Sequence, residues 1–339
     1  MDAGGSGFIA SHITEALLRS RYNVVVTVRS EEKGHKLKKC YESDGNAARF
    51  DFVVVNNIIE DSAFDEAARA RQFHYVIHTA CPYHFNIQDP LKDFLEPAVR
   101  GTVGILHSVR NHAPTVKRVI LLSSSATILN PSNHSKVYDE TMHGTTSWKE
   151  AMDPRLAYRA SKIYAESAAF DFISIEKPTF DLVVLNPPLV FGAAPKHIVS
   201  PEDLNTSNER IRDMVMGCFR ETLPPTGPVY LFADVRDVAE AHVKALEAGA
   251  EAGGQRFFIV GGHFSNKRLA DAVRACRPEL GRVLPDVNQA EDDMPKDVYG
   301  FDNSKSREVL GLQYTGLEVC VRDTVESILA IQNTGDGFP

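Results

Sequence analysis

Short apolar runs alternate with longer amphipathic stretches between residues 23 and 192 of this 339-residue chain. The runs are continuous rather than alternating, as expected of parallel strands that helices cover on both faces. They occupy residues 24–28, 50–55, 75–78, 119–122 and 182–185. The stretches between them predict helices at residues 9–19, 62–71, 91–109 and 156–175. Such alternation predicts an α/β fold, a doubly wound parallel sheet with right-handed crossovers.

A glycine-rich loop, Gly4-Gly5-Ser6-Gly7-Phe8-Ile9-Ala10, opens the first predicted helix. Read as G-x-x-G-x-x-A, it places small residues where a tight turn, a pyrophosphate and a helix–strand contact require them. The helix that follows offers free N–H groups and its positive dipole end to phosphates. Taken alone, the loop could also be a simple helix cap. With the strand–helix pattern, it predicts a Rossmann-type dinucleotide site that includes Gly4, Gly7, Phe8 and Ile9.

Only Met1, Asp2 and Ala3 precede this loop, where the central strand of the sheet is expected. Three residues are too few for such a strand, so we expect the first strand to be missing, as in a truncated gene model or a shortened isoform. A sheet without its middle strand would expose apolar surface. The sequence therefore predicts a poorly stable protein.

The rhythm changes after Gly192, where proline and glycine cluster at residues 223–228 and the apolar runs become short and irregular. We predict a dinucleotide-binding domain made of residues 1–192, to which residues 231–261 return. Residues 193–230 and 262–339 are predicted to form a smaller substrate-binding lobe.

The second predicted strand is followed by Arg29, Ser30 and Lys33. Enzymes selective for NAD usually place an acidic residue here, which holds the ribose 2′-hydroxyl, whereas a 2′-phosphate needs cations. These three residues predict NADP(H) as the cofactor. The alternative interpretation is a solvated basic strand end.

Tyr158 and Lys162 are four residues apart in a predicted helix, which puts the phenol and the ammonium on one face. A nearby ammonium lowers the pKa of a phenol from its ordinary value of about 10. Three serines, Ser123 to Ser125, follow the strand at 119–122, at the sheet edge where α/β proteins bind ligands. Either motif alone could be a surface helix or a turn. Loop, strand-end serine and Y-x-x-x-K in this order argue against coincidence, and the serine hydroxyl can hydrogen-bond a substrate carbonyl together with the phenol.

Composition limits the partners of such a fold. The formal net charge of −8 argues against binding to nucleic acid or to an anionic membrane. No apolar stretch approaches the roughly 18 residues of a membrane span. The five cysteines are widely spaced without a C-x-x-C pair, so neither disulfides nor a metal site are expected. The N-terminus has no signal-peptide profile, which predicts a cytoplasmic protein.

The chain resembles the extended short-chain dehydrogenase/reductase family over nearly its whole length. Within that family it looks most like the branch of dihydroflavonol reductase, cinnamoyl-CoA reductase and the fungal carbonyl, aldehyde and methylglyoxal reductases. The motifs that carry the resemblance lie at residues 4–10, 28–30, 78–82, 97–102, 117–125, 158–162, 186–192, 234–239 and 310–312.

The resemblance implies a role for individual residues. Ser124 would be the catalytic serine, with Ser125 as the alternative, and Tyr158 would be the general acid whose pKa Lys162 lowers. The cofactor would also contact Asn57, Ile58, Thr79, Ala80, Tyr158, Lys162, Pro188 and Val190. Asn57 and Ile58 stand where the family has an acidic residue that faces the adenine, which is a departure. Tyr83 and Phe85 would line the substrate mouth.

The function predicted is NADPH-dependent reduction of a small aldehyde or ketone by a monomer or weak homodimer. One alternative is a nucleotide-sugar epimerase or dehydratase, which shares the serine, tyrosine and lysine. Arg29 and the apolar mouth at Tyr83 and Phe85 speak against that alternative. The other is a non-catalytic NADP-binding protein, which the missing strand would favour.

Overall fold

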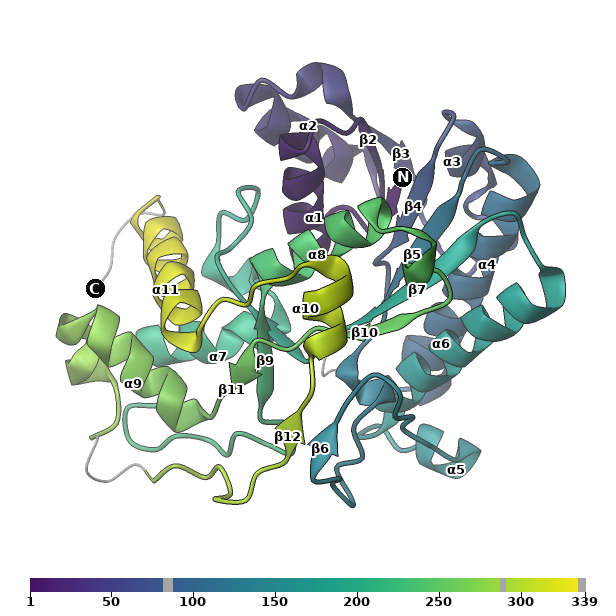
Figure 1. The fold of residues 1–339 in the computed structure, drawn as a ribbon. Helices are drawn as coiled ribbons and strands as arrows, with labels where there is room; N and C mark the ends of the chain where they lie inside the picture. Colours follow the sequence, from purple (N-terminus) through teal and green to yellow (C-terminus); the bar gives the residue numbers. More distant parts are fainter. Residues whose placement is uncertain (82–87, 287–290, 335–339) are drawn as a thin grey trace.

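The computed structural model describes residues 1–81, 88–286 and 291–334. Its centre is a parallel sheet of seven strands in the order β10-β7-β5-β4-β1-β2-β3 within these residues (Figure 1). The strands are β1 (Asp2–Ala3), β2 (Val24–Val28), β3 (Phe50–Val54), β4 (Tyr75–His78), β5 (Arg118–Leu122), β7 (Asp181–Asn186) and β10 (Arg256–Phe258). The predicted doubly wound α/β fold is confirmed.

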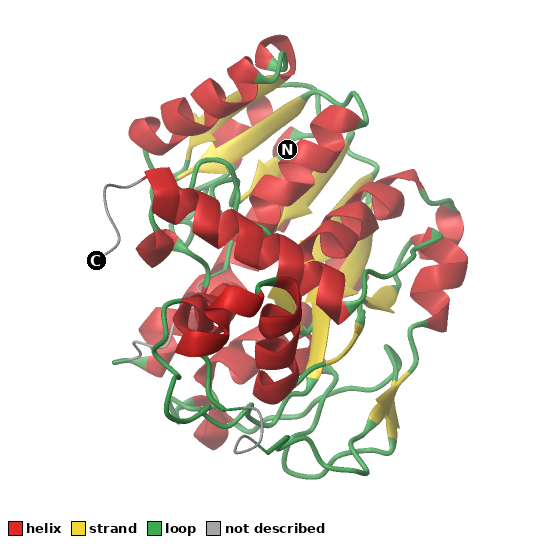
Figure 2. Cartoon of the chain, turned by 90° about the vertical axis from the view of Figure 1, so that its left-hand side faces the viewer, coloured by secondary structure: helices red, strands yellow, loops and turns green. Residues whose placement is uncertain are grey.

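Helices cover both faces of the sheet (Figure 2). One face packs against α1 (Phe8–Arg19), α2 (Glu31–Ser43) and α8 (Val235–Glu247). The other packs against α3 (Asp65–Arg69), α4 (Glu96–His112) and α6 (Ala157–Glu176). Because successive residues of a strand point to opposite faces, a strand covered on both sides must be apolar throughout.

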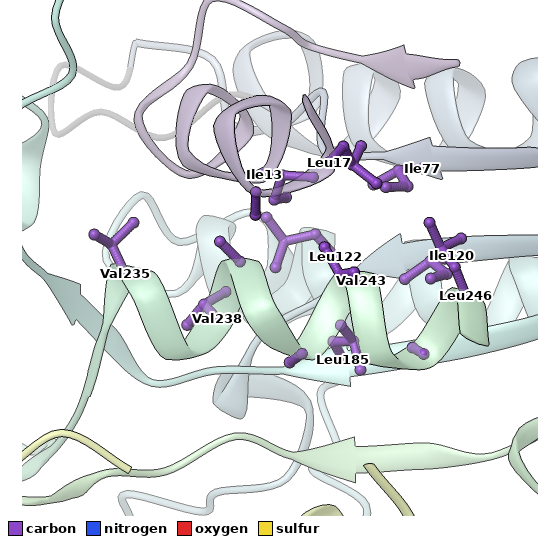
Figure 3. Close-up of a cluster of buried hydrophobic side chains, with 14 of the residues drawn as sticks. Ile13, Leu17, Ile77, Ile120, Leu122, Leu185, Val235, Val238, Val243 and Leu246 are labelled. Atoms are coloured by element: carbon purple, nitrogen blue, oxygen red, sulfur yellow. The ribbon is translucent and has the colours of Figure 1, made fainter. Parts of the chain in front are cut away.

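Strand β5 illustrates this rule. Ile120 and Leu122 lie in the cluster under α1 and α8, which Figure 3 shows in close-up. Val119 and Leu121 lie in the cluster on the opposite face. The continuous apolar run that predicted the strand is thus accounted for by burial on both sides.

The expectation that the first strand is missing is wrong. Asp2–Ala3 form β1 between β2 and β4, with Asp2 opposite Val26 and Ile77. The Ile77 N–H donates to the Met1 carbonyl at 2.8 Å. Two residues suffice because neighbouring strands on both sides pair with the backbone, and fully buried Ala3 fills the apolar layer. β1 is still short, with two residues against five in β2.

A smaller sheet and three helices form another apolar cluster beside the main sheet. Strands β8 (Leu189–Phe191), β9 (Leu231–Asp234) and β11 (Gly262–His263) form a three-stranded sheet. Helices α7 (Thr206–Val215), α9 (Asn266–Cys276) and α11 (Leu317–Thr334) share an apolar cluster with it. The remaining elements are β6 (Val137–Tyr138), α5 (Trp148–Ala151), β12 (Gly300–Phe301) and α10 (Ser304–Leu310). The two-domain division at the predicted bounds stays a prediction.

Among the helices described, none is long and apolar enough to cross a membrane.

Candidate active site

The glycine-rich loop connects β1 to α1 at the carboxyl edge of the sheet. Gly4 has a φ of +111°, and a Cβ there would lie 2.7 Å from Thr79 Oγ1 and 2.9 Å from the Ala80 nitrogen. Only glycine fits this conformation and this close approach to the end of β4. The turn therefore brings Gly4 directly beside Thr79, one of the residues predicted to border the cofactor.

The start of α1 is built to receive an anion. Gly7 is its N-terminal cap residue, and no side chain caps the helix. A Cβ at Gly7 would meet nothing nearer than the Gly4 carbonyl oxygen at 3.3 Å, so a ligand can approach the backbone there. Uncapped N–H groups and the helix dipole favour phosphate at such a position. These features fit the pyrophosphate of a dinucleotide.

A cleft of about 880 Å³ runs from this loop along the carboxyl ends of the strands. It brings together most of the predicted site. The residues of that prediction that line it are Gly4, Gly7, Phe8, Ile9, Thr79, Ser124, Tyr158, Lys162, Pro188 and Val190. Its lining also includes the apolar residues Leu129, Pro131, Leu156, Leu204, Pro228 and Val229, beside the polar residues Arg155, Arg159, Asn205, Thr206 and Ser207.

Ser124 lies two residues beyond the end of β5 and caps a short turn at Ser125–Thr127, where its Oγ accepts a hydrogen bond from the Ala126 N–H at 3.1 Å. Its side chain is also hydrogen-bonded to the Tyr158 hydroxyl. Ser125 lines the cleft as well. The hydrogen bond to Tyr158 favours Ser124 over Ser125 as the serine that acts with the phenol.

Tyr158 lies in the first turn of α6, with its ring edge-on to Phe94. Burial raises the pKa of its phenol, and the hydrogen bond with Ser124 opposes that rise. The phenol is therefore protonated at neutral pH and can donate a proton. The ammonium of Lys162, one turn along the same helix, donates to the Leu122 carbonyl at 3.2 Å. Its expected lowering of the Tyr158 pKa stays a prediction.

The residues predicted to make the site selective for NADP(H) over NAD(H) lie where β2 ends, outside the lining of the cleft. Ser30 caps α2 by accepting a hydrogen bond from the Lys33 N–H at 3.3 Å. The side chains of Arg29 and Lys33 are exposed, and the described residues provide no hydrogen bond or ion pair to either. Both cations are thus available to a phosphate that reaches this edge.

Five other predicted residues fall outside the cleft lining or outside the described chain. Asn57 and Ile58 follow β3, and the Asn57 side chain is occupied by the Ile59 N–H and by Glu60. Ala80 faces a small interior cavity behind Lys162. Tyr83 and Phe85 lie outside the described residues.

A buried ion pair beneath the serines was missed by sequence reasoning. Glu166 Oε1 lies 2.7 Å from Arg256 Nε, and both side chains are almost fully buried. Glu166 Oε2 accepts hydrogen bonds from the Ser123 and Thr127 hydroxyls at 2.5 and 3.0 Å and from the Asn186 amide at 2.8 Å. The pair thus joins α6 to the ends of β5 and β7 and to β10.

One signal in the sequence could have found Glu166. It follows Lys162 by four residues, as Lys162 follows Tyr158, so all three share one face of α6. No comparable signal exists for Arg256, which meets Glu166 only because β10 pairs with β7.

A doubly wound sheet, an uncapped helix behind a glycine-rich turn, and a serine, tyrosine and lysine around one cleft define a dinucleotide-binding α/β protein. A model of the NAD dependent epimerase/dehydratase family matches residues 3–261. The chain belongs to this family, and the resemblance to extended short-chain dehydrogenases/reductases is confirmed.

Relatives match along almost the entire chain. It is 54% identical over 327 residues to the ketoreductase azaE of Aspergillus niger, with 96% of each protein covered. It is 33% identical over 341 residues to the NADPH-dependent methylglyoxal reductase GRE2 of Saccharomyces cerevisiae, covering 97% of this chain and 98% of that one. The structure of yeast methylglyoxal/isovaleraldehyde reductase Gre2 with NADPH superimposes with a TM-score of 0.90 at 31% identity, covering 98% of both chains.

Proposed function

We propose that this protein is an NADPH-dependent reductase that converts a small aldehyde or ketone to the alcohol. The observation that carries the proposal is the hydrogen bond between Tyr158 and Ser124 in a cleft that also contains Lys162 and the glycine-rich loop. The relatives support it, because one is named a ketoreductase and another an NADPH-dependent methylglyoxal reductase.

The side chains of the cleft act on the carbonyl oxygen. Ser124 and Tyr158 hold this oxygen between two hydroxyl groups, which stabilise the negative charge that develops on it. Tyr158 then donates its proton to that oxygen, which its raised pKa allows at neutral pH. Bound NADPH supplies the hydride to the carbonyl carbon. Lys162 keeps positive charge near the phenolate that remains.

Holding the cofactor falls to residues at the sheet edge. Gly4, Gly7, Phe8 and Ile9 bind the pyrophosphate through backbone N–H groups at the start of α1. Pro188 and Val190 would position the nicotinamide amide and Thr79 would border the cofactor, since all three line the cleft; Ala80, which follows Thr79, would border the cofactor as well. Arg29 and Lys33 pair with the 2′-phosphate, whose charge they match, and Ser30 adds a hydroxyl.

The direct test is a fluorescence titration of the purified chain with NADPH and, in parallel, with NADH. We expect tighter binding of NADPH. Methylglyoxal, isovaleraldehyde and a set of aliphatic and aryl ketones are then offered with NADPH, and its oxidation is followed by absorbance. Binding of neither nucleotide by the folded protein, or binding without turnover of any carbonyl compound, would reject the proposal.

The non-catalytic alternative loses its main support, because it relied on a missing first strand and β1 occupies that place. We further propose a cytoplasmic location and a monomeric or weakly dimeric state. Cell fractionation and sedimentation velocity would test these two points.

A further inference from the structure

We propose that Glu166, held by Arg256, is a positioning residue that fixes Ser124 against Tyr158. The inference rests on the proposed reductase function, since it concerns how the groups of that site are kept in place. Neither residue lines the main cleft, so any effect on the reaction passes through others.

The first link runs from Glu166 to the strand ends. One oxygen of its carboxylate accepts three hydrogen bonds, from Ser123, Thr127 and Asn186. Ser123 directly follows β5, and Asn186 is the last residue of β7. Hydrogen bonds to an ionised acceptor are stronger than those between neutral groups. The carboxylate therefore locks both strand ends to α6.

The second link runs from these donors to Ser124. The Ser124 carbonyl accepts from the Thr127 N–H at 3.0 Å, and Thr127 Oγ1 lies 2.9 Å away. Thr127 Oγ1 itself accepts from Asn186 Nδ2 and Arg256 Nη2, each at 2.9 Å. With both its acceptor positions filled, the hydroxyl must point its single proton towards Glu166 or the Ser124 carbonyl. The backbone of Ser124 is thus held by groups that the ion pair orients.

Arg256 stabilises the position of the Glu166 carboxylate. Besides its ion pair with Glu166, the Arg256 guanidinium donates hydrogen bonds to the carbonyls of Glu140 and Met142, each at 2.7 Å. A carboxylate this deeply buried needs a paired charge, because an unpaired one is strongly unfavourable. Arg256 therefore supplies both the charge and a fixed direction for the Glu166 side chain.

The third link is the helix itself. Tyr158, Lys162 and Glu166 follow one another at four-residue intervals along α6. The carboxylate ties this helix to the strand end that carries Ser124, and Lys162 ties it to the Leu122 carbonyl just before that end. The helix that bears Tyr158 and the strand end that bears Ser124 are thus joined at two points.

The test uses Glu166→Gln, which keeps the size of the side chain but removes its charge. Both carboxylate oxygens of Glu166 face donors, so the NH₂ group of the glutamine must replace one acceptor with a donor. The matched control is Asp181→Asn. Asp181 pairs with Arg118 at 2.7 Å at the opposite ends of the same strands, β7 and β5, far from the cleft. Both variants should have a lower Tm than the wild type, because each loses one charge of an ion pair. The control therefore shows what a general loss of stability does to kcat.

We expect Glu166→Gln to lower kcat by about 10- to 100-fold, as small displacements of reacting groups do. The Kd of this variant for NADPH should change by less than about twofold. With deuterium at the transferred position of NADPH, the kinetic isotope effect on kcat should be larger in the variant than in the wild type. Asp181→Asn should keep kcat. Equal kcat in Glu166→Gln and wild type, or an equal loss in both variants, would overturn the proposal.

Two further measurements keep the outcome decisive. If Glu166→Gln does not fold, Thr127→Val removes the linking hydroxyl at nearly constant shape and should show the same loss of kcat. A crystal structure of either variant should show the Tyr158–Ser124 hydrogen bond broken or lengthened. An unchanged hydrogen bond would refute the positioning role even if the wild type proved not to be a reductase, so the two proposals fail separately.

Discussion

At the scale of single residues, spacing in the sequence predicts three residues that the fold brings around one cleft. Tyr158 and Lys162 share a helix face, and Ser124 follows a strand that the apolar run had already located. All three line one cleft. The spacing also puts Glu166 on the same helix face, but its partners could not be assigned in this way, because they come from the ends of β5 and β7 and from β10 and meet only in the folded sheet.

Replacing Tyr158 by phenylalanine removes the proton donor and keeps the ring. We expect kcat to fall by about 100-fold or more, the range for general acid catalysis, while the Kd for NADPH stays within about twofold. Steady-state kinetics and a fluorescence titration measure the two effects. Tyr164→Phe, on the same helix but against Trp148, is the control and should keep kcat. Full activity of Tyr158→Phe would contradict the assignment.

Arg29→Ala should weaken NADPH binding by about 10- to 100-fold, since a hydrogen bond to a charged group contributes about 1.5–3 kcal/mol. The Kd for NADH, which lacks the 2′-phosphate, should hardly change. Titrations with both nucleotides give the ratio, and Arg19→Ala at the far end of α1 serves as control. Equally weakened binding of NADPH and NADH would contradict a contact between Arg29 and the 2′-phosphate.

At the scale of elements, local patterns were reliable for strands and weaker for polar helices. Helix α2, Glu31–Ser43, was not predicted because its sequence is largely charged and buries only Gly34, Leu37 and Tyr41. Strand β1 was judged impossible from its length alone. The pairing of both its edges with β2 and β4 made two residues sufficient, which no local pattern reveals.

Strand β1 contains a buried carboxyl group, Asp2, that should lower the free energy of unfolding at neutral pH. Asp2 is fully buried, and burial raises the pKa of its carboxyl to about 7. The folded state thus binds a proton that the unfolded state has released, so the free energy of unfolding falls as pH rises from about 4 to 7. Asp2→Asn lacks this penalty. Its stability advantage in urea should grow by more than about 1 kcal/mol over this range, and a pH-independent difference would contradict the argument.

At the scale of the whole molecule, alternation along the chain was enough to predict the sheet and its two helical layers. The three-stranded sheet of β8, β9 and β11 was not foreseen, because its short strands come from segments far apart in sequence. Their association depends on the shared apolar cluster around Phe191, Phe232 and Phe264. Such contacts leave little trace in the pattern of any one segment.

Acid stability should reflect histidines buried within the fold. Burial lowers the pKa of His242 on α8 to about 4. Between pH 6.5 and 4 the unfolded chain takes up a proton that the folded chain refuses, so the free energy of unfolding falls as pH falls. His242→Gln should lose less stability over this interval, by about 1 kcal/mol or more, in urea unfolding. His35→Gln, at an exposed site, should behave like the wild type.

The lining of the cleft is built from different parts of the chain. Ser124 follows β5, and Tyr158 and Lys162 lie on α6, inside the architecture that holds the sheet together. Other lining residues come from outside the main sheet, at residues 129–131, 154–156, 204–207 and 228–229. Chemistry and molecular recognition are thus separable traits in this scaffold. Directed evolution confined to the lining residues there that are not buried, such as Arg155, Leu156 and Pro228, would be expected to retune which carbonyl compounds are accepted without disturbing the folding core.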